Sequence, residues 1–508
     1  MPDYLKHTED SELSNLKLEK FKKYIKGRRA AVIGVGISNR PLIKWLDSLG
    51  ADITAFDAHD TGEPSIAKAV EDFKEMNVKV RWSLGSDYMK PLFDETFDIV
   101  FKTPKMRFTV DALESQRRKG AVLTTEMELF LDLCPAETFG ITGSDGKTTT
   151  TTIVYEILRT AGYNCYLGGN IGTPLLDQIE KITPEDKVVL ELSSFQLLGL
   201  KRSVDNAIVT NITPNHLDFH FDYQEYISSK TNIFANQGAT GKLVLNSAND
   251  LTYDMRNIAR GRVSYFCGDS CVNLRNTYKN ADIAFLDDDG SLCLQTPKGI
   301  QRIINKNDIL IPGSHNVQNF LAAIALTSDL VSTDDIVTVA KNFKGVQHRI
   351  EFVRELDGVK WYNSSIDTSP NRTINTMNAL SDRNMHGVLI CGGKDKQCVY
   401  DGLGDAILKF ADRIVIYGSN ARLVRQILEK EADGRKYEVF EIEGGDEVYE
   451  LPATREKALQ NMTEAVNKAR SLAKPGDVVI MSSVGTSYDH FRHFEHRGDL
   501  FKKLVNDL

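Results

Sequence analysis

Glycines, a lysine and a row of threonines stand close together at residues 139–150, Phe-Gly-Ile-Thr-Gly-Ser-Asp-Gly-Lys-Thr-Thr-Thr. Glycines let the backbone turn tightly and direct several amides at one anion, a lysine adds a cation, and a threonine hydroxyl suits Mg²⁺. The helical pattern that follows would set the positive end of its dipole behind the phosphates. We predict a nucleoside triphosphate site, although the spacing Gly-x-x-Gly-Lys-Thr is shorter than the usual phosphate-loop pattern. The alternative is a glycine turn before a helix, with a solvated lysine. The residues expected to contact the nucleotide are Gly143, Ser144, Asp145, Gly146, Lys147, Thr148 and Thr149.

Composition restricts the class of protein. At 508 residues the chain exceeds a single core, and 41% hydrophobic with 26% charged residues is ordinary for a folded protein. A net charge of −8 argues against a general nucleic-acid binder, since no domain-wide basic surface is available. The start lacks an apolar signal core, and no apolar run has the length of a membrane span, so we expect a cytoplasmic protein without membrane insertion.

The 7 cysteines are scattered and lack paired C-x-x-C spacing. Such spacing is what a zinc site commonly shows, and a disulfide framework is typical of small secreted domains. We therefore expect reduced thiols that mostly pack in the core.

A β-α-β unit is predicted at residues 29–57, where an apolar strand leads into Gly34-x-Gly36, a helix follows, and a second strand ends at Asp57. The third glycine of the dinucleotide-binding pattern is Asn39 here. Tight packing explains the turn as well as ligand binding does. If the turn binds a ligand, we expect it to hold a diphosphate or ribose, with Asp57 near a sugar or base.

Two further strands, at 186–194 and 207–212, bring polar residues to the predicted edge beside the phosphate loop. In a doubly wound sheet, ligands lie beyond the carboxyl ends of the strands, so Lys147, Glu191 and His216 could meet in one crevice. Each has a plainer explanation when taken alone: Glu191 as a helix-pairing partner and His216 as a satisfied loop histidine. Lys230 could equally be a solvated helix lysine.

The C-terminal part predicts another α/β sheet, with strands at 386–391, 413–417 and 477–481 that each end in small polar residues. Such strand ends commonly hold anionic ligands. A polar joint at 345–349 separates this part from a helix that starts near Gly313. Residues 271–311, with a turn at 288–290, are expected to be a β-rich addition without an assigned role.

These motifs together resemble the Mur ligases of peptidoglycan assembly over nearly the whole chain. The segments that carry the resemblance are the phosphate loop, 168–172, 191–196, 211–216, 313–319, 348–349, 392–396 and 487–498. Gly34-Val-Gly-Ile-Ser-Asn-Arg40 and the segment 487–498 point to the members that add D-glutamate. The resemblance implies an α/β fold of three domains: a Rossmann-like UDP-substrate domain at 1–133, a central P-loop ATPase domain at 134–345, and a Rossmann-like amino-acid domain at 346–508.

The resemblance also implies a reaction. ATP would phosphorylate the terminal carboxylate of UDP-N-acetylmuramoyl-L-alanine, and the amine of D-glutamate would attack the acyl phosphate, so that a tetrahedral intermediate expels phosphate. Two Mg²⁺ ions are expected, and Lys230 would carry a carbamate that turns a cation into a metal ligand. A monomer is expected. The implied catalytic residues are Lys147, His216 and Lys230, and the implied metal ligands are Thr148, Glu191, His216 and Lys230.

The remaining site residues come from the same resemblance. For the UDP substrate they are Gly36, Ile37, Ser38, Asp57, Asn170 and Ser193. For ATP they are Asn316, Asn319 and Arg349, in addition to the phosphate loop. For D-glutamate they are Thr368, Lys396, Ser487 and Phe494, of which Phe494 could instead be core packing.

The chain departs from the family pattern at residues 362–368. The family pattern has an acid near the ATP ribose, and this chain has Ser364 at that position. The nearby acid is instead Asp367. We hypothesise that Asp367, or a water, replaces that contact. The lysine expected at position 366 is Ile366, which puts one contact to D-glutamate or phosphate in doubt.

Three other functions compete with this prediction. The first is another amino-acid-adding Mur ligase or a folylpolyglutamate-type ligase. The second is a non-catalytic nucleotide-binding protein, which the residue at 364 could suggest, although a scaffold does not need Lys147, Glu191, His216 and Lys230 together. The third is a nicotinamide dehydrogenase, which only the Gly34-x-Gly36 turn supports.

Overall fold

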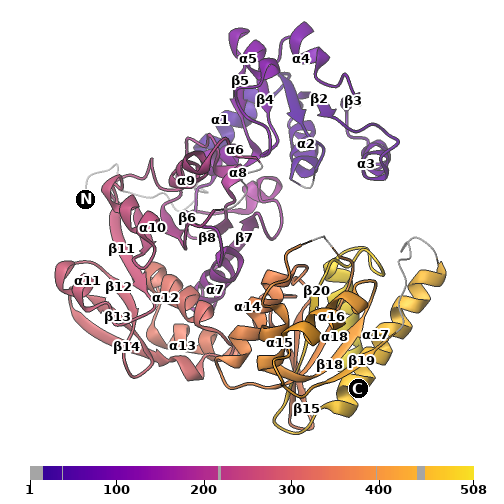
Figure 1. Ribbon diagram of the computed structural model, residues 1–508. Coiled ribbons are helices and arrows are strands. Elements are labelled where there is room, and N and C mark those ends of the chain that lie inside the picture. The colour runs from indigo at the N-terminus through magenta and orange to yellow at the C-terminus, as the bar shows by residue number, and fades with distance from the viewer. Residues whose placement is uncertain (1–14, 37, 215–218, 396–397, 443–451) are drawn as a thin grey trace. The chain divides into compact units, whose positions relative to one another are not determined.

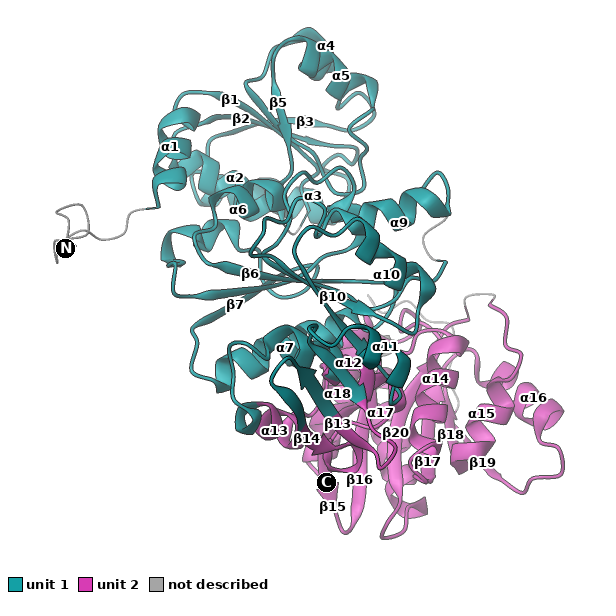
Figure 2. Ribbon diagram, turned by 90° about the vertical axis from the view of Figure 1, so that its left-hand side faces the viewer, with its two compact units in different colours: residues 1–285, 293–301, 321–335 teal, residues 286–292, 302–320, 336–508 magenta. Residues whose placement is uncertain are grey.

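The computed structural model describes residues 15–36, 38–214, 219–395, 398–442 and 452–508, with only the backbone of 452–454 (Figure 1). The chain divides into two compact units (Figure 2). The first comprises residues 1–285, 293–301 and 321–335, and the second comprises 286–292, 302–320 and 336–508. Three sheets run through the chain in sequence order.

The first sheet is parallel and has the order β3-β2-β1-β4-β5. Its central strands β1, β2 and β4 are mostly buried, as is usual in parallel sheets, whereas the edge strands β3 and β5 are only partly buried. The strand order reverses between β1 and β4, which makes that edge the place where a ligand would bind. The strands are β1 Arg29–Ile33, β2 Asp52–Asp57, β3 Val80–Leu84, β4 Ile99–Phe101 and β5 Val122–Thr124. The helices are α1 Leu16–Ile25, α2 Asn39–Ser48, α3 Pro64–Glu75, α4 Lys90–Asp94, α5 Asp111–Arg118 and α6 Glu126–Leu133.

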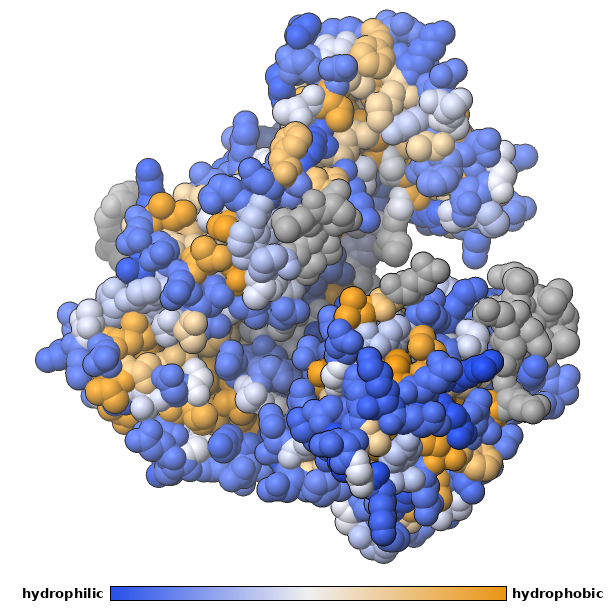
Figure 3. All heavy atoms as spheres, viewed as in Figure 1, coloured by the Kyte–Doolittle hydropathy of each residue, from blue (hydrophilic) through white to orange (hydrophobic). Residues whose placement is uncertain are grey.

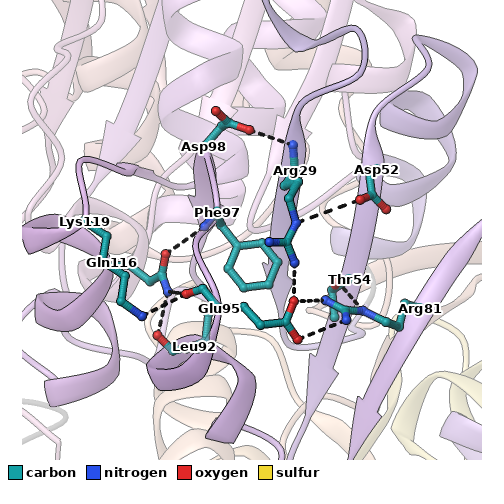
Figure 4. Close-up of polar contacts among 10 residues, drawn as sticks. All are labelled: Arg29, Asp52, Thr54, Arg81, Leu92, Glu95, Phe97, Asp98, Gln116 and Lys119. Atoms are coloured by element: carbon teal, nitrogen blue, oxygen red, sulfur yellow. Dashed lines mark hydrogen bonds and ion pairs between the residues drawn. The ribbon is translucent and has the colours of Figure 1, made fainter.

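A polar network ties α4 and α5 to the start of β4 (Figure 4). Gln116 is fully buried, and its amide oxygen accepts the backbone N–H of Phe97 at 3.0 Å. Its amide nitrogen donates to the carbonyls of Leu92 at 2.5 Å and Glu95 at 2.8 Å. Buried backbone groups must be paired. The Gln116 side chain provides hydrogen-bond partners for backbone groups of α4 and of the turn that leads from it to β4.

The second sheet has nine strands in the order β14-β13-β12-β11-β10-β9-β6-β8-β7. Within it, the neighbouring strands from β7 through β8, β6, β9, β10 and β11 to β12 pair in parallel. The strands are β6 Glu137–Thr142, β7 Cys165–Gly169, β8 Lys187–Glu191, β9 Asn206–Val209, β10 Lys242–Asn246, β11 Arg262–Cys267, β12 Ile283–Leu286, β13 Ser291–Thr296 and β14 Gly299–Asn305. The helices are α7 Lys147–Thr160, α8 Ser194–Leu197, α9 Tyr223–Thr231, α10 Asp250–Asp254, α11 Val272–Thr277, α12 Ser314–Thr327 and α13 Thr333–Asn342. Single 3-10 turns lie at Leu176–Lys181, Met255–Asn257 and Lys306–Asp308.

The segment 271–311 extends this second sheet by β12, β13 and β14 and adds the short helix α11. The predicted turn is present, with the N–H of Gly290 donating to the carbonyl of Asp287 at 2.9 Å. The expectation of a β-rich addition is confirmed, with the added detail that its strands continue the main sheet.

The third sheet has the order β15-β16-β20-β17-β18-β19, parallel except for the antiparallel pair β15 and β16. Alternate residues of its central strands face different helices: Leu389 packs in the core formed with α14, α15 and α16, and Ile390 in the core formed with α17 and α18. The strands are β15 Glu351–Leu356, β16 Val359–Ser364, β17 Gly387–Gly392, β18 Ala411–Tyr417, β19 Glu438–Glu441 and β20 Val478–Val484. The helices are α14 Pro370–Ser381, α15 Leu403–Phe410, α16 Ala421–Glu431, α17 Pro452–Leu472 and α18 Phe494–Asn506.

The structure is therefore a mixed α/β protein in which parallel strand pairs dominate, as the sequence predicts. The three predicted domain boundaries stay a prediction. No helix among the described residues is long and apolar enough to cross a bilayer. On the face shown in Figure 3, apolar residues form small groups between hydrophilic ones.

The cysteines depart from expectation at one place. A disulfide joins Cys267 and Cys271, whereas Cys134, Cys165, Cys293, Cys391 and Cys398 form no disulfide. The prediction of reduced thiols is wrong for this pair. The two Cα atoms lie 6.6 Å apart, within the range that a disulfide spans, and the backbone at Cys271 is left-handed with a φ of 32°.

We expect Gln116→Leu to lower the free energy of unfolding by about 2–4 kcal/mol, because it leaves the Phe97 N–H and the Leu92 carbonyl, both of buried residues, without their partner. Urea unfolding, with hydrogen exchange at the Phe97 amide, measures the loss. Lys119→Met is the matched control: the Lys119 ammonium also donates to the Glu95 carbonyl, at 2.9 Å, but is exposed. It should cost less than about 0.5 kcal/mol. Equal losses in the two variants would contradict the role given to Gln116.

Candidate functional site

The predicted phosphate loop connects β6 to α7 (Figure 1). Gly143 has a φ of 146° and Gly146, the N-cap of α7, a φ of 78°, both in a region that disfavours other residues. A Cβ atom at Gly143 would lie 1.8 Å from the Oγ1 of Thr210. Both glycines are therefore required by the backbone itself, and the loop delivers the first-turn amides of α7, which have no intrahelical acceptor.

The segment after β9 holds this loop in place. Thr210 Oγ1 donates to the Asp145 carbonyl at 2.6 Å, and the N–H of Ser144 donates to the Asn211 carbonyl at 2.9 Å. Ser144 is buried, and its hydroxyl donates to the carbonyl of Thr213 at 3.0 Å and lies 2.8 Å from the hydroxyl of Tyr226. The Ser144 hydroxyl and its backbone N–H thus both brace the loop, and the contact of Ser144 with the nucleotide stays a prediction.

Two lysines bond to consecutive carbonyls of the loop. Lys147 Nζ donates to the Ser144 carbonyl at 2.9 Å, and Lys230 Nζ, from α9, donates to the Gly143 carbonyl at 2.7 Å. Lys230 is 1% exposed. Burial lowers the pKa of Lys230 well below its ordinary value, and the charge of Lys147 lowers it further, while Asp145 and Glu191 act in the opposite direction. The solvated-lysine alternative is thereby excluded for Lys230.

Glu191 ends β8 and is 1% exposed. Its Oε1 accepts the side-chain amide of Asn170 at 2.8 Å, whereas its Oε2 has no hydrogen-bond partner among the described residues. A buried carboxylate oxygen without a partner is costly, and a divalent cation would satisfy it. Thr148, half-buried in the first turn of α7, adds a hydroxyl of the kind that Mg²⁺ accepts. Unmodified Lys230 would oppose such a cation.

Three predicted site residues, Ile37, His216 and Lys396, lie outside the described residues. Of the others in the first unit, Thr149 is buried in the first turn of α7. Ser193 caps α8, where its hydroxyl accepts the N–H of Gln196 at 3.3 Å. That local bond accounts for Ser193 without a ligand.

Sequence reasoning missed the network that fixes α9, the helix of Lys230. Glu225 forms a bidentate ion pair with Arg107, one bond of which measures 2.8 Å, and its Oε2 lies 3.2 Å from His220 Nδ1. The other ring nitrogen of His220 lies 3.1 Å from Ser194 Oγ. The bonds from Arg107, helped by the Phe221 amide and His220, outweigh burial and lower the pKa of Glu225 to about 2. Arg107 and Glu225 are 118 residues apart in sequence, so no local pattern could reveal the pair.

The glycine turn of the first sheet is braced by residues of its own. Asn39, at the position of the missing third glycine, donates to the carbonyls of Ile33 at 3.0 Å and Gly34 at 2.8 Å. Asp57 Oδ2 accepts the N–H of Val35 at 2.8 Å. Burial acts to raise the pKa of Asp57, but hydrogen bonds from Val35 and His59 outweigh it and the pKa is lowered.

Gly36 differs from Gly34 in this turn. It is exposed, and a Cβ atom there would meet nothing within 4 Å. Ser38, half-buried, is the N-cap residue of α2 and makes no side-chain capping bond. The front of the turn is therefore open, as approach of a ligand requires.

In the second unit, Asn316 and Asn319 lie on α12 and are buried. The Asn316 amide donates to the Pro312 carbonyl, and the Asn319 amide donates to Asn316 Oδ1 at 3.2 Å. Arg349 stands between His348 and Ile350, whose φ angles are 64° and 43°. Arg349 is thus flanked on both sides by residues with a left-handed backbone. Such a backbone stores strain, which is typical of functional segments.

The residues predicted for D-glutamate lie around the ends of β16 and β20. Ser487 is buried, Thr368 is half-buried, and the half-buried Phe494 opens α18. The carbonyl of Phe494 accepts the hydroxyl of Ser365 at 2.7 Å, and its ring contacts His348 edge-on. These contacts support the alternative that Phe494 is a packing residue. Its contact with D-glutamate stays a prediction.

Asp367, which departs from the family pattern, is buried. Its Oδ2 accepts the hydroxyls of Thr376 and Ser482, each at 2.8 Å. Burial raises the pKa of Asp367, although the hydroxyls act to lower it. Ser364 Oγ accepts the N–H of Ile350 at 3.2 Å. The contact of Asp367 with a ribose stays a prediction.

Two family models match the chain. Residues 141–327 match the Mur ligase middle domain, and residues 348–485 match the Mur ligase glutamate ligase domain. Among curated proteins, the UDP-N-acetylmuramoylalanine--D-glutamate ligase of Ruminiclostridium cellulolyticum is 44% identical over 97% of this chain and 100% of its own. The enzyme of the same name from Acetivibrio thermocellus is 45% identical over 97% of this chain and 99% of its own.

Solved structures agree at the level of the fold. A UDP-N-acetylmuramate-alanine ligase from Thermotoga maritima aligns with a TM-score of 0.53 at 17% identity, over 94% of this chain and 99% of its own. A UDP-N-acetylmuramoyl-L-alanyl-D-glutamate--2,6-diaminopimelate ligase aligns with a TM-score of 0.52 at 15% identity, over 96% of this chain and 93% of its own. The resemblance inferred from the motifs is confirmed, and the chain belongs to the Mur ligase family.

Proposed function

We propose that this chain is an ATP-dependent ligase that joins D-glutamate to UDP-N-acetylmuramoyl-L-alanine in peptidoglycan precursor synthesis, as a cytoplasmic monomer. The observation that carries the proposal is full-length identity of 44% and 45% to relatives of that name. The described site supports it, because the phosphate loop, two lysines and a buried carboxylate are the groups that phosphoryl transfer to a carboxylate needs.

The reaction runs in two transfers. The γ-phosphoryl group of ATP moves to the alanine carboxylate of the UDP substrate, and ADP leaves. The D-glutamate amine then attacks the acyl carbon, and the tetrahedral intermediate expels phosphate as the amide forms. The loop amides and the first turn of α7 bind the phosphates, and Lys147 neutralises charge on the group in transfer.

Mg²⁺, when bound, screens the negative charges that keep ATP and a carboxylate apart. Thr148 and Glu191 would hold one ion, and His216 with carbamylated Lys230 a second. A carbamate forms when a neutral amine attacks CO₂ and releases one proton. The lowered pKa of Lys230 favours that neutral amine, and the product carboxylate removes the conflict between a buried lysine and a cation.

The other substrates are assigned by region. Gly36, Ile37, Ser38, Asp57, Asn170 and Ser193 would serve the UDP substrate, with support from the open front of the Gly36 turn. Asn316, Asn319, Arg349 and Asp367 would serve ATP, and Thr368, Lys396, Ser487 and Phe494 would serve D-glutamate. Three domains, at 1–133, 134–345 and 346–508, of Rossmann-like, P-loop and Rossmann-like type, have the support of one sheet each.

We expect phosphate release from ATP to require both UDP-N-acetylmuramoyl-L-alanine and D-glutamate, and Lys147→Ala to lower kcat by at least about 100-fold, the size of effect seen when one charge-stabilising donor is lost. The measurement is a phosphate assay with a panel of amino acids. Lys20→Ala, an exposed lysine of α1, is the control and should retain full activity. Equal turnover with L-glutamate, lysine or diaminopimelate would contradict the substrate assignment.

We expect Lys230 to take up CO₂, because its amine is buried and pushed toward the neutral form. Protein in ¹³C-bicarbonate should show a carbamate signal that Lys230→Ala abolishes, and labelling should weaken as the pH falls and the amine is protonated. Lys230→Ala should also lose ligase activity and regain part of it with short-chain carboxylic acids.

Lys242 is the matched control for this labelling. It is 2% exposed and burial lowers its pKa too, but its ammonium pairs with Asp329 at 3.0 Å and Asp282 at 3.5 Å, which act to raise the pKa, so it should be labelled less than Lys230. Full activity of Lys230→Ala without added acid would remove the carbamate from the mechanism.

A further inference from the structure

The disulfide between Cys267 and Cys271 lies at the end of β11, outside the site described above. Cys267 is 2% exposed, and Cys271, half-buried, is the N-cap residue of α11. The five-residue loop that they close contains Asp269, whose Oδ1 accepts the N–H of Cys271 at 2.9 Å. The loop is thus shaped by its own hydrogen bonds as well as by the covalent bond.

Small molecules can reach this pair. A pocket of about 560 Å³ is lined by both cysteines, together with residues of α10, α11 and the turn after β10. Of the cysteines outside this disulfide, Cys293 and Cys391 are buried. Burial raises the pKa of Cys391 to about 12, which keeps that thiol protonated and unreactive. Cys398 is exposed but does not line this pocket, so the cysteines that an exchange partner meets there are Cys267 and Cys271.

The surroundings also accommodate the reduced state. Cys267 Sγ lies 3.4 Å from the carbonyl of Asp269, which would accept a hydrogen bond from the thiol. Helix α11 buries none of its residues. It is held from the side by Arg275, which stacks on Phe285 at 3.9 Å and donates to Gln295 at 3.3 Å. Opening the disulfide would therefore release the loop at residues 267–271 without removing a helix from the core.

A chain of hydrogen bonds connects this loop to the phosphate loop. The carbonyl of Phe266, next to Cys267, accepts both the N–H and the hydroxyl of Ser247, at 3.1 and 3.2 Å. The neighbouring Asn246 donates to the Thr210 carbonyl at 2.9 Å. Thr210 Oγ1 in turn donates to the carbonyl of Asp145 within the phosphate loop.

A second residue of the same turn strengthens the connection. Asn249 accepts the N–H of Ile212 at 3.3 Å and donates to the Ile212 carbonyl at 3.1 Å, which fixes the segment that holds Ser144. Tyr253, on the helix that Asn249 caps, lines the pocket beside the cysteines. A shift of the β11 end would thus be transmitted to the segment 210–213, which contacts the phosphate loop at Ser144 and Asp145.

We propose that Cys267 and Cys271 form a reversible thiol–disulfide exchange site for low-molecular-weight disulfides, and that its state alters nucleotide binding at the phosphate loop. The thiolate of Cys271 attacks a small disulfide RSSR, and one RS⁻ leaves. The thiolate of Cys267 then attacks the Cys271 sulfur of the mixed disulfide, and the second RS⁻ leaves. Two electrons pass from the protein to RSSR, and the two thiol protons end on two RSH.

The test of exchange uses the full chain and needs no activity. Protein reduced with dithiothreitol and then exposed to glutathione disulfide should lose two reactive thiols, and mass spectrometry should find Cys267 linked to Cys271. Dithiothreitol should restore both thiols. Cys271→Ser, which keeps a good N-cap residue, should retain at most a mixed disulfide at Cys267, whereas Cys398→Ser should behave as the parent chain. Failure to form the internal disulfide would overturn the proposal, as would tight stoichiometric Zn²⁺ binding by the reduced protein that blocks oxidation.

The test of communication rests on the proposed function, because it measures ATP binding. The dissociation constant for ATP, determined by calorimetry, should differ by about fivefold or more between the reduced and oxidised parent chain and not between the same treatments of Cys271→Ser. Equal affinities in the two states of the parent would overturn the communication. Absence of ATP binding in both states would instead refute the nucleotide site itself.

Discussion

The arrangement of the phosphate loop depends on the buried lysine Lys230, which lies beside it. Lys230 bonds to the Gly143 carbonyl and lies 4.7 Å from the centre of the Tyr226 ring, and no described carboxylate forms an ion pair with it. Lys242, equally buried, has two carboxylate partners. Burial of an unpaired ammonium is costly, so the amine of Lys230 is driven toward its neutral form. A neutral amine is also the form that reacts with CO₂. The same burial that disfavours the ammonium would therefore favour a carbamate, which could act as a metal ligand.

That amine is useful only if α9 is held at the right place, and its fixation comes from a distant part of the chain. The helix is short, so its own backbone bonds stabilise it little. The ion pair of Arg107 with Glu225 supplies the missing constraint, and His220 connects Glu225 to the start of α8 through Ser194. Since α8 follows the strand of Glu191, one network positions the helix of the lysine and the strand of the carboxylate.

Much of the fold follows from local patterns. The phosphate loop, Glu191 at a strand end and the central strands of the third sheet are evident in sequence because each depends on neighbouring residues and on the periodicity of burial. The pairing of Arg107 with Glu225 joins segments that no local signal connects. The disulfide at Cys267 depends on a left-handed backbone at Cys271, which a cysteine rarely adopts. The bracing of the phosphate loop by the Ser144 hydroxyl depends on Tyr226 and Thr213, which are far from it in sequence, so no local pattern could reveal it.

The glycines separate what the chain needs for itself from what it leaves open for a ligand. At Gly143 a side chain would collide with Thr210, and at Gly34 the left-handed φ of 85° excludes most residues, so both serve the fold. Gly36 has neither constraint, since its backbone is not left-handed and a Cβ atom would meet nothing within 4 Å. A side chain at Gly36 would stand in the open space before the turn. The switch point between β1 and β4 lies at the same edge, and bracing by Asn39 keeps the turn rigid without filling that space. The loss of the third glycine is therefore compatible with a ligand site, because Asn39 supports the turn from behind and leaves its front clear.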